Sequence, residues 1–98
     1  MVVKEVLEQL QTATHPVAKA LHKNEHFNVL VLGFRAGMLL KEHKTSRPSK
    51  LTILQGKVIY REANREVIAA QHDTVEIPVE VLHSVEATQD SLCLLTQG

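Results

Sequence analysis

Cysteine is nearly absent from this sequence. Cys93 is the single cysteine, so no internal disulfide can form and no cluster of thiolates can hold zinc or an iron–sulfur centre. Such a chain is typical of a reducing compartment, and we expect a cytoplasmic location. Cys93 itself lies in the apolar run 92–95, which predicts a buried and inert thiol.

An excess of charge of either sign is also lacking, as is any long hydrophobic run. Eleven Lys and Arg residues balance eleven Asp and Glu residues, so no net field attracts phosphate backbones or anionic lipids. No apolar stretch approaches the roughly 18 residues that cross a membrane, and the N-terminus lacks a signal-peptide pattern. We therefore expect neither nucleic acid nor a membrane as a partner.

The chain length predicts one domain over residues 1–98, with a short helix at about 2–12 and a barrel at about 16–97. Apolar side chains recur at helical spacing near the N-terminus, at Val3, Val6, Leu7 and Leu10. A chain of 98 residues builds only a modest core, and tryptophan is absent. We expect a homodimer, in which the helix or the strand 17–21 finds a partner surface.

Beyond Pro16 the hydrophobic runs become short and β-branched, and turn residues recur about every 8–12 positions. No helical stretch of crossover length separates the runs, so parallel β-α-β units are excluded. This cadence predicts an all-β sandwich or barrel. The expected strands are 17–21, 27–34, 38–43, 50–54, 57–62, 66–70, 74–77, 83–87 and 92–96.

Six histidines raise the question of metal binding. Four of them lie at turns or loop ends where exposed side chains are expected: His15, His22, His26 and His72. The other two, His43 and His83, each lie at the end of an expected strand. Each of these two is also embedded in a longer ordered pattern.

Two segments carry that pattern. Gly37 is followed after five residues by His43, and the segment continues to Gly56, while Pro78 precedes His83 by five positions in the second segment. These segments resemble the two motifs of the cupin superfamily: glycine, five residues, His-x-His, three or four residues, Glu, six residues, glycine; and glycine, five residues, Pro-x-Gly, two residues, His, three residues, Asn. The resemblance covers about residues 27–96 and implies a cupin-type antiparallel β-barrel, or jelly roll.

The departures from these motifs bear on function. In the family, two histidines and a glutamate of the first motif hold a metal together with the histidine of the second. Thr45 stands here at the second histidine position and Ser49 at the glutamate position, so only His43 and His83 remain as metal ligands. Two imidazoles leave most coordination positions to water, so we expect at most a weakly bound divalent metal and no other cofactor. His26 supplies a third imidazole if its strand lies alongside.

The second motif has also lost its glycines. His72 and Glu80 stand at the two glycine positions, and Ala87 replaces the terminal asparagine. We therefore expect the turn before His83 to be rebuilt.

Strand alternation offers a check that is independent of the family. If His43 faces inward, Thr45 does too, while its charged neighbours face solvent. His83 likewise shares an inward face with Val85. The two histidines either share one pocket or are separate structural residues. A shared pocket predicts that His43, His83, Thr45 and Arg47 bind a ligand.

The remaining charged residues are expected on solvated faces. Glutamates such as Glu62 and Glu86 occur singly, with no spacing that forces acid and base geometry. Four cations surround the loop after His43 and either form a positive rim for an anionic ligand or are ordinary surface charge: Lys41, Lys44, Arg47 and Lys50. Nucleotide-binding and α/β-hydrolase motifs are absent.

Two functions follow from these patterns. The first is a protein that binds a small molecule inside the barrel without an efficient metal site. The alternative is a metal-dependent enzyme of dioxygenase or isomerase type. The family resemblance does not choose between them, since such barrels serve many functions.

Overall fold

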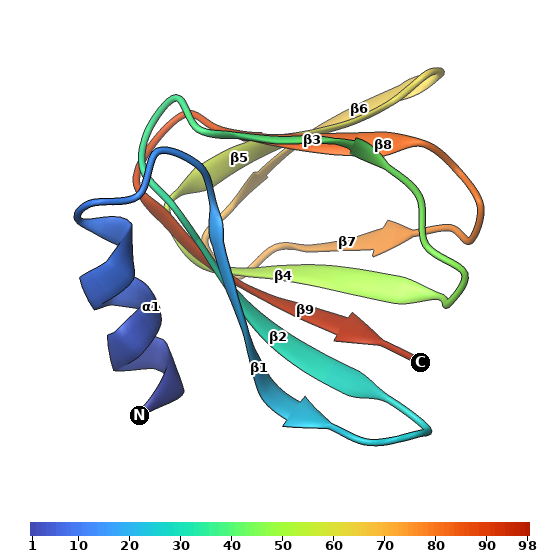
Figure 1. Ribbon diagram of the computed structural model, residues 1–98. Helices are drawn as coiled ribbons and strands as arrows, with labels where there is room; N and C mark the ends of the chain where they lie inside the picture. Colours follow the sequence, from blue (N-terminus) through green and yellow to red (C-terminus); the bar gives the residue numbers. More distant parts are fainter.

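The computed structural model describes residues 1–98 and contains one helix followed by nine strands (Figure 1). Their bounds are α1 (Val2–Leu10), β1 (Val17–Lys23), β2 (Asn28–Phe34), β3 (Leu39–His43), β4 (Ser49–Gln55), β5 (Lys57–Glu62), β6 (Arg65–Ala70), β7 (Thr74–Ile77), β8 (His83–Ala87) and β9 (Ser91–Gln97). The nine expected strands are all present, and the predicted short N-terminal helix is confirmed.

The strands form two antiparallel sheets that face each other (Figure 1). The five-stranded sheet has the order β1-β2-β9-β4-β7, and the four-stranded sheet has the order β3-β8-β5-β6. Every strand pair is antiparallel, as the absence of crossover helices predicts. The all-β barrel architecture is therefore confirmed.

The core fills the space between the sheets because alternate residues of each strand point inward. In β8, for example, His83, Val85 and Ala87 are buried while the residues between them are half-buried. The largest fully buried side chains include Tyr60 and Phe34, two of the three aromatic residues. Cys93 is fully buried as expected, and burial raises the pKa of its thiol to about 12, so it stays protonated.

Helix α1 packs outside the barrel, against β1 and β2 (Figure 1). Val6 and Leu10 form its buried face. Gly33 of β2 permits this close approach, because a Cβ atom there would lie 2.7 Å from Val6 Cγ1. Arg35 then fixes the chain after the helix by donating to the carbonyls of Gln11, at 2.7 Å, and Ala13.

The helix is far too short and polar to act as a membrane span, and no other helix is present.

Candidate functional site

His43 and His83 are brought side by side. They are directly opposed cross-strand partners on β3 and β8, with ring centroids 4.3 Å apart. His83 is 3% exposed, whereas His43 lies on the edge strand of its sheet and is exposed. The sequence motifs therefore identified two residues that are far apart in the chain and in contact in the fold.

A β-bulge in β3 makes this pairing. Leu40 lies opposite Val85 and His43 lies opposite His83, so three steps along β3 match two steps along β8. The extra residue reverses the alternation of β3 between these two points. The His43 side chain therefore lies on the same inward face of the sheet as His83 and Val85 of β8.

Both imidazole rings are oriented by the backbone. His43 Nδ1 lies 2.8 Å from the carbonyl oxygen of Lys41, and His83 Nδ1 lies 3.0 Å from that of Val81. A carbonyl only accepts, so each neutral ring carries its proton on Nδ1 and leaves Nε2 as an acceptor. Burial, with the neighbouring His43, lowers the pKa of His83 below its ordinary value, which favours this neutral form.

The same row of side chains continues across the four-stranded sheet. Glu62 of β5 lies opposite His83, and Arg65 of β6 lies opposite Glu62. Arg65 Nη2 donates to Glu62 Oε2 at 2.8 Å, and the Tyr60 hydroxyl donates to the same oxygen at 2.5 Å. The side chain of Glu62 is 13% exposed, so the prediction that it lies on a solvated face is wrong. Glu62 lies two residues after Tyr60, so both side chains share one face of β5, but the sequence alone does not show that this face is covered.

Tyr60 lies beneath this row. Its ring stacks on His83 at a centroid distance of 5.7 Å, and the Arg65 guanidinium carbon lies 5.2 Å from its centroid. Burial, followed by the hydrogen bond to Glu62, raises the pKa of Tyr60 to about 12. Its hydroxyl thus remains a donor that holds the Glu62 carboxylate, whose own pKa that bond lowers.

A second row, with three polar residues and one isoleucine, faces the first from the five-stranded sheet. Asn28, Gln97, Ser49 and Ile77 are consecutive cross-strand neighbours on β2, β9, β4 and β7. Ser49 is 5% exposed, and its hydroxyl donates to the carbonyl of Arg47 at 3.0 Å. The side-chain oxygen of Asn28 is buried without a hydrogen-bond partner.

A cavity of about 680 Å³, here named the mouth cavity, lies between these rows at the open end of the barrel. Both sheets contribute to it: Ser49, Ile77 and Gln97 from one, Glu62 and Arg65 from the other. Its remaining lining residues are Phe27, Pro48, Lys50, Glu76, Pro78, Thr96 and Gly98. Sequence reasoning missed Arg65 because its role depends on strand register, which no local pattern reveals.

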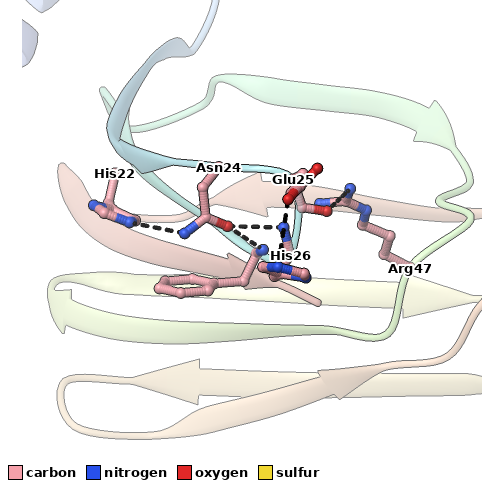
Figure 2. Close-up of polar contacts among 6 residues, drawn as sticks. His22, Asn24, Glu25, His26 and Arg47 are labelled. Atoms are coloured by element: carbon pink, nitrogen blue, oxygen red, sulfur yellow. Dashed lines mark hydrogen bonds and ion pairs between the residues drawn. The ribbon is translucent and has the colours of Figure 1, made fainter.

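Thr45 and Arg47 lie on the loop between β3 and β4 and do not line the mouth cavity. Thr45 Oγ1 accepts the backbone N–H of Arg47 at 3.2 Å. The Arg47 guanidinium extends to the β1–β2 loop, where Nη2 donates to the carbonyl of Glu25 at 3.2 Å (Figure 2). Its Nη1 is buried without a partner. His43 and His83 do not line the mouth cavity either, so none of the four predicted site residues forms part of its wall.

The β1–β2 loop is folded by Asn24. Its side-chain oxygen accepts the backbone N–H groups of His26 and Phe27, both at 2.8 Å, and its amide contacts His22 (Figure 2). His22 and His26 are exposed, as predicted, and so are His15 and His72. His26 lies beside Glu25 at 3.6 Å and is not part of a metal-binding cluster, so it does not supply a third imidazole.

His72 and Glu80 have a shared backbone feature. They are the only non-glycine residues with positive φ, at 77° and 59°. These are the two positions where the resembled motif carries glycine, the residue that adopts this conformation most readily.

Lys44 contacts Glu80 at 3.7 Å and Lys50 contacts Glu76 at 3.7 Å, so two cations of the expected rim are paired with carboxylates.

The donor set does not fit a tightly bound metal. No group of three or more His, Cys, Asp or Glu side chains is placed to hold an ion. His43 and His83 offer one free nitrogen each, and the Ser49 hydroxyl is neutral and already bonded. Two imidazoles without a carboxylate neither fix the geometry nor offset the desolvation of a divalent cation.

Comparison with known proteins shows the fold. A cupin superfamily protein from Desulfitobacterium hafniense has a TM-score of 0.80 at 15% identity, over 86% of this chain and 77% of that one. An RmlC-like cupin from Desulfovibrio desulfuricans has a TM-score of 0.79 at 22% identity, over 86% of this chain and 82% of that one. A cupin-like protein from Thermotoga maritima has a TM-score of 0.74 at 25% identity, over 85% of this chain and 67% of that one. No family model and no curated protein sequence matches. The chain therefore has the cupin fold that its motifs predict.

Proposed function

We propose that this cupin-fold protein binds a small organic molecule in the mouth cavity. The volume of about 680 Å³ carries the proposal, because ligand sites typically have a volume of roughly 300–1,000 Å³. The lining is mostly polar and charged, with side chains from both sheets, and Phe27 and Ile77 are its two hydrophobic residues. Such a mixture binds an organic ligand and fixes its orientation.

The two histidines belong to this proposal as ligand-binding groups. His83 is the cross-strand neighbour of Glu62, which lines the mouth cavity, and His43 follows it in the same row. Their free Nε2 atoms are acceptors for a ligand hydroxyl or amide. Thr45 and Arg47 remain predicted contacts on the adjoining loop, where Arg47 Nη1 is buried without a partner.

A direct test screens a chemically diverse fragment library by two-dimensional NMR. Binding in the mouth cavity shifts the resonances of Glu62, Arg65 and Gln97. The variant Gln97→Trp places a bulky ring in the cavity and abolishes the shifts, whereas Glu8→Trp, at an exposed position of α1, leaves them unchanged. A library without any binder at these residues, or binding that survives in a folded Gln97→Trp protein, contradicts the proposal.

Metal analysis separates this function from the metalloenzyme alternative. The two-imidazole donor set leads us to expect far less than one ion per chain after purification without chelator. Iron, manganese, nickel or zinc at near one ion per chain, lost on replacing His43 or His83, would establish the alternative instead.

We also propose that the chain forms a homodimer, and a cytoplasmic location stays a prediction. Leu39, Glu86, Ile59 and Ile68 form one cross-strand row on the four-stranded sheet. Glu86 is paired with Arg61, and Leu39 and Ile68 are 47% and 63% exposed. Removing the exposed apolar side chains of this row from water would favour the association of two copies. Sedimentation should show a dimer that Ile68→Asp dissociates. A wild-type monomer at every concentration contradicts it.

A further inference from the structure

The ion pair at the wall of the mouth cavity leaves three of its five polar side-chain atoms without a hydrogen bond to the protein. Glu62 accepts both of its hydrogen bonds, from Tyr60 and Arg65, through Oε2. Arg65 makes both of its hydrogen bonds, to Glu62 and to the carbonyl of Glu76 at 2.7 Å, through Nη2. Glu62 Oε1 therefore has no protein donor, and Arg65 Nη1 and Nε have no protein acceptor. An acceptor and a donor lie next to each other.

These atoms are held in place by the protein itself. The Tyr60 hydroxyl fixes the carboxylate, while the Tyr60 ring and the Glu76 carbonyl fix the guanidinium. Tyr60 is fully buried, so its position is set by the core. A ligand that uses the free atoms thus meets an arrangement that needs no reorganisation.

The charges of the mouth cavity cancel in pairs. Its two cations are Arg65, bonded to Glu62, and Lys50, which lies 3.7 Å from Glu76. An ionic ligand gains little from such paired charges, yet it loses its hydration on entering. A neutral polar ligand has a smaller desolvation cost and keeps the hydrogen bonds.

We infer that the mouth cavity selects a neutral molecule with adjacent hydroxyl groups. One hydroxyl donates to Glu62 Oε1, and its neighbour accepts from the free N–H groups of Arg65. Hydroxyls are suited to this wall because each both donates and accepts. On the rest of the lining, Ser49 and Gln97 provide neutral polar groups, and Phe27 provides apolar surface for the carbon chain. This inference rests on the proposed function.

Three compounds with the same six-carbon polyhydroxyl skeleton test the selection: neutral D-glucitol, anionic D-gluconate and cationic D-glucamine. Titrations followed by NMR should show D-glucitol shifting the Glu62 and Arg65 resonances with an affinity at least about tenfold higher than the other two. Added salt should leave the D-glucitol affinity unchanged, since no ionic attraction is screened.

Substitutions test the residues. Glu62→Gln removes the carboxylate acceptor, and Arg65→Gln removes the guanidinium donors, so each should weaken D-glucitol binding by about tenfold or more. Glu66→Gln is the matched control, because Glu66 pairs with Arg61 on the next rung of the same hairpin and does not line the mouth cavity. This control should bind D-glucitol as the wild type does. Arg65 is 43% exposed, so its variant should fold even if Glu62→Gln does not.

The outcomes distinguish a failure of the polyol inference from a failure of the proposed function. Preferred binding of D-gluconate or D-glucamine overturns the inference and leaves the proposed function standing. The same holds if no polyol binds while a library fragment shifts the cavity resonances, or if D-glucitol binds both folded variants as well as the wild type. If neither the polyols nor any fragment binds there, both the inference and the proposed function fall.

Discussion

Tyr60 offers a direct optical test of how the candidate site is built. It is the only tyrosine, and the chain has no tryptophan, so the phenolate absorbance reports this one hydroxyl. Tyr60 is fully buried, and its hydroxyl donates to Glu62. Burial and that carboxylate both oppose formation of a phenolate, and they raise the pKa of Tyr60 from its ordinary 10.0 to about 12.

The magnitude follows from this shift. At about pH 11 a tyrosine with an unshifted pKa is about nine-tenths ionised, whereas one with a pKa of about 12 is about one-tenth ionised. Because the folded pKa is the higher one, the stabilisation is complete below pH 10 and is lost as the pH rises through 12. Two pKa units correspond to about 2.7 kcal/mol in all, of which about 1.4 kcal/mol is lost by pH 11.

The assay is a spectroscopic pH titration with and without urea. The folded protein should show little phenolate at about pH 11, and unfolding it there should release the phenolate absorbance. Urea denaturation of the wild type and Tyr60→Phe isolates this group from the lysines and arginines. The stability advantage of the wild type should shrink by about 1.4 kcal/mol between about pH 9 and pH 11.

Two further variants locate the cause. Glu62→Gln removes the negative charge, so the pKa of Tyr60 should fall but stay above 10, since burial is the larger cause. Glu66→Gln on the outer face should leave the titration unchanged. A wild-type midpoint near 10 in the folded protein, verified by dichroism, would refute the described packing of this residue.

Three shorter predictions concern the frame of the site. His72→Gly and Glu80→Gly should each raise the free energy of unfolding by about 0.5–1 kcal/mol, because a positive φ strains both side chains; a loss in urea denaturation contradicts this. Gly33→Ala should lower the free energy of unfolding by about 1–3 kcal/mol, because its methyl group clashes with Val6. In a Val6→Ala background this loss should be smaller; losses that simply add up would argue against the contact. The lowered pKa of His83 means that the unfolded state takes up a proton more readily, so stability should fall from about pH 7.5 to 5.5 and fall less in a folded His83→Gln variant; equal slopes refute it.

The architecture was within reach of the sequence because turns and hydrophobic runs are local signals. The strands Lys57–Glu62, Thr74–Ile77 and His83–Ala87 have the predicted bounds, since each ends at a Gly, Asn, Asp or Pro turn. The contact between His43 and His83 was also within reach, because the motif offsets specify both positions.

The ion pair at the wall of the mouth cavity could not be predicted from the sequence. Glu62 and Arg65 meet because a two-residue turn folds β6 back on β5, and their meeting with His83 depends on how β8 is aligned with β5. Those alignments are set by packing across the barrel. A glutamate in an alternating strand looks the same in sequence whether its face is filled or open to water.

The bulge in β3 bears on how such a site changes. If the chain lost one residue between Leu40 and His43, the regular ladder would return with His43 still opposite His83, because two steps along β3 would then match two steps along β8. The rest of the barrel would keep its alignment, because Leu40 and Val85 anchor the strand on the other side. A deletion at the bulge therefore keeps the two imidazoles paired, whereas the full sequence in a regular ladder would place the Glu42 carboxylate opposite His83.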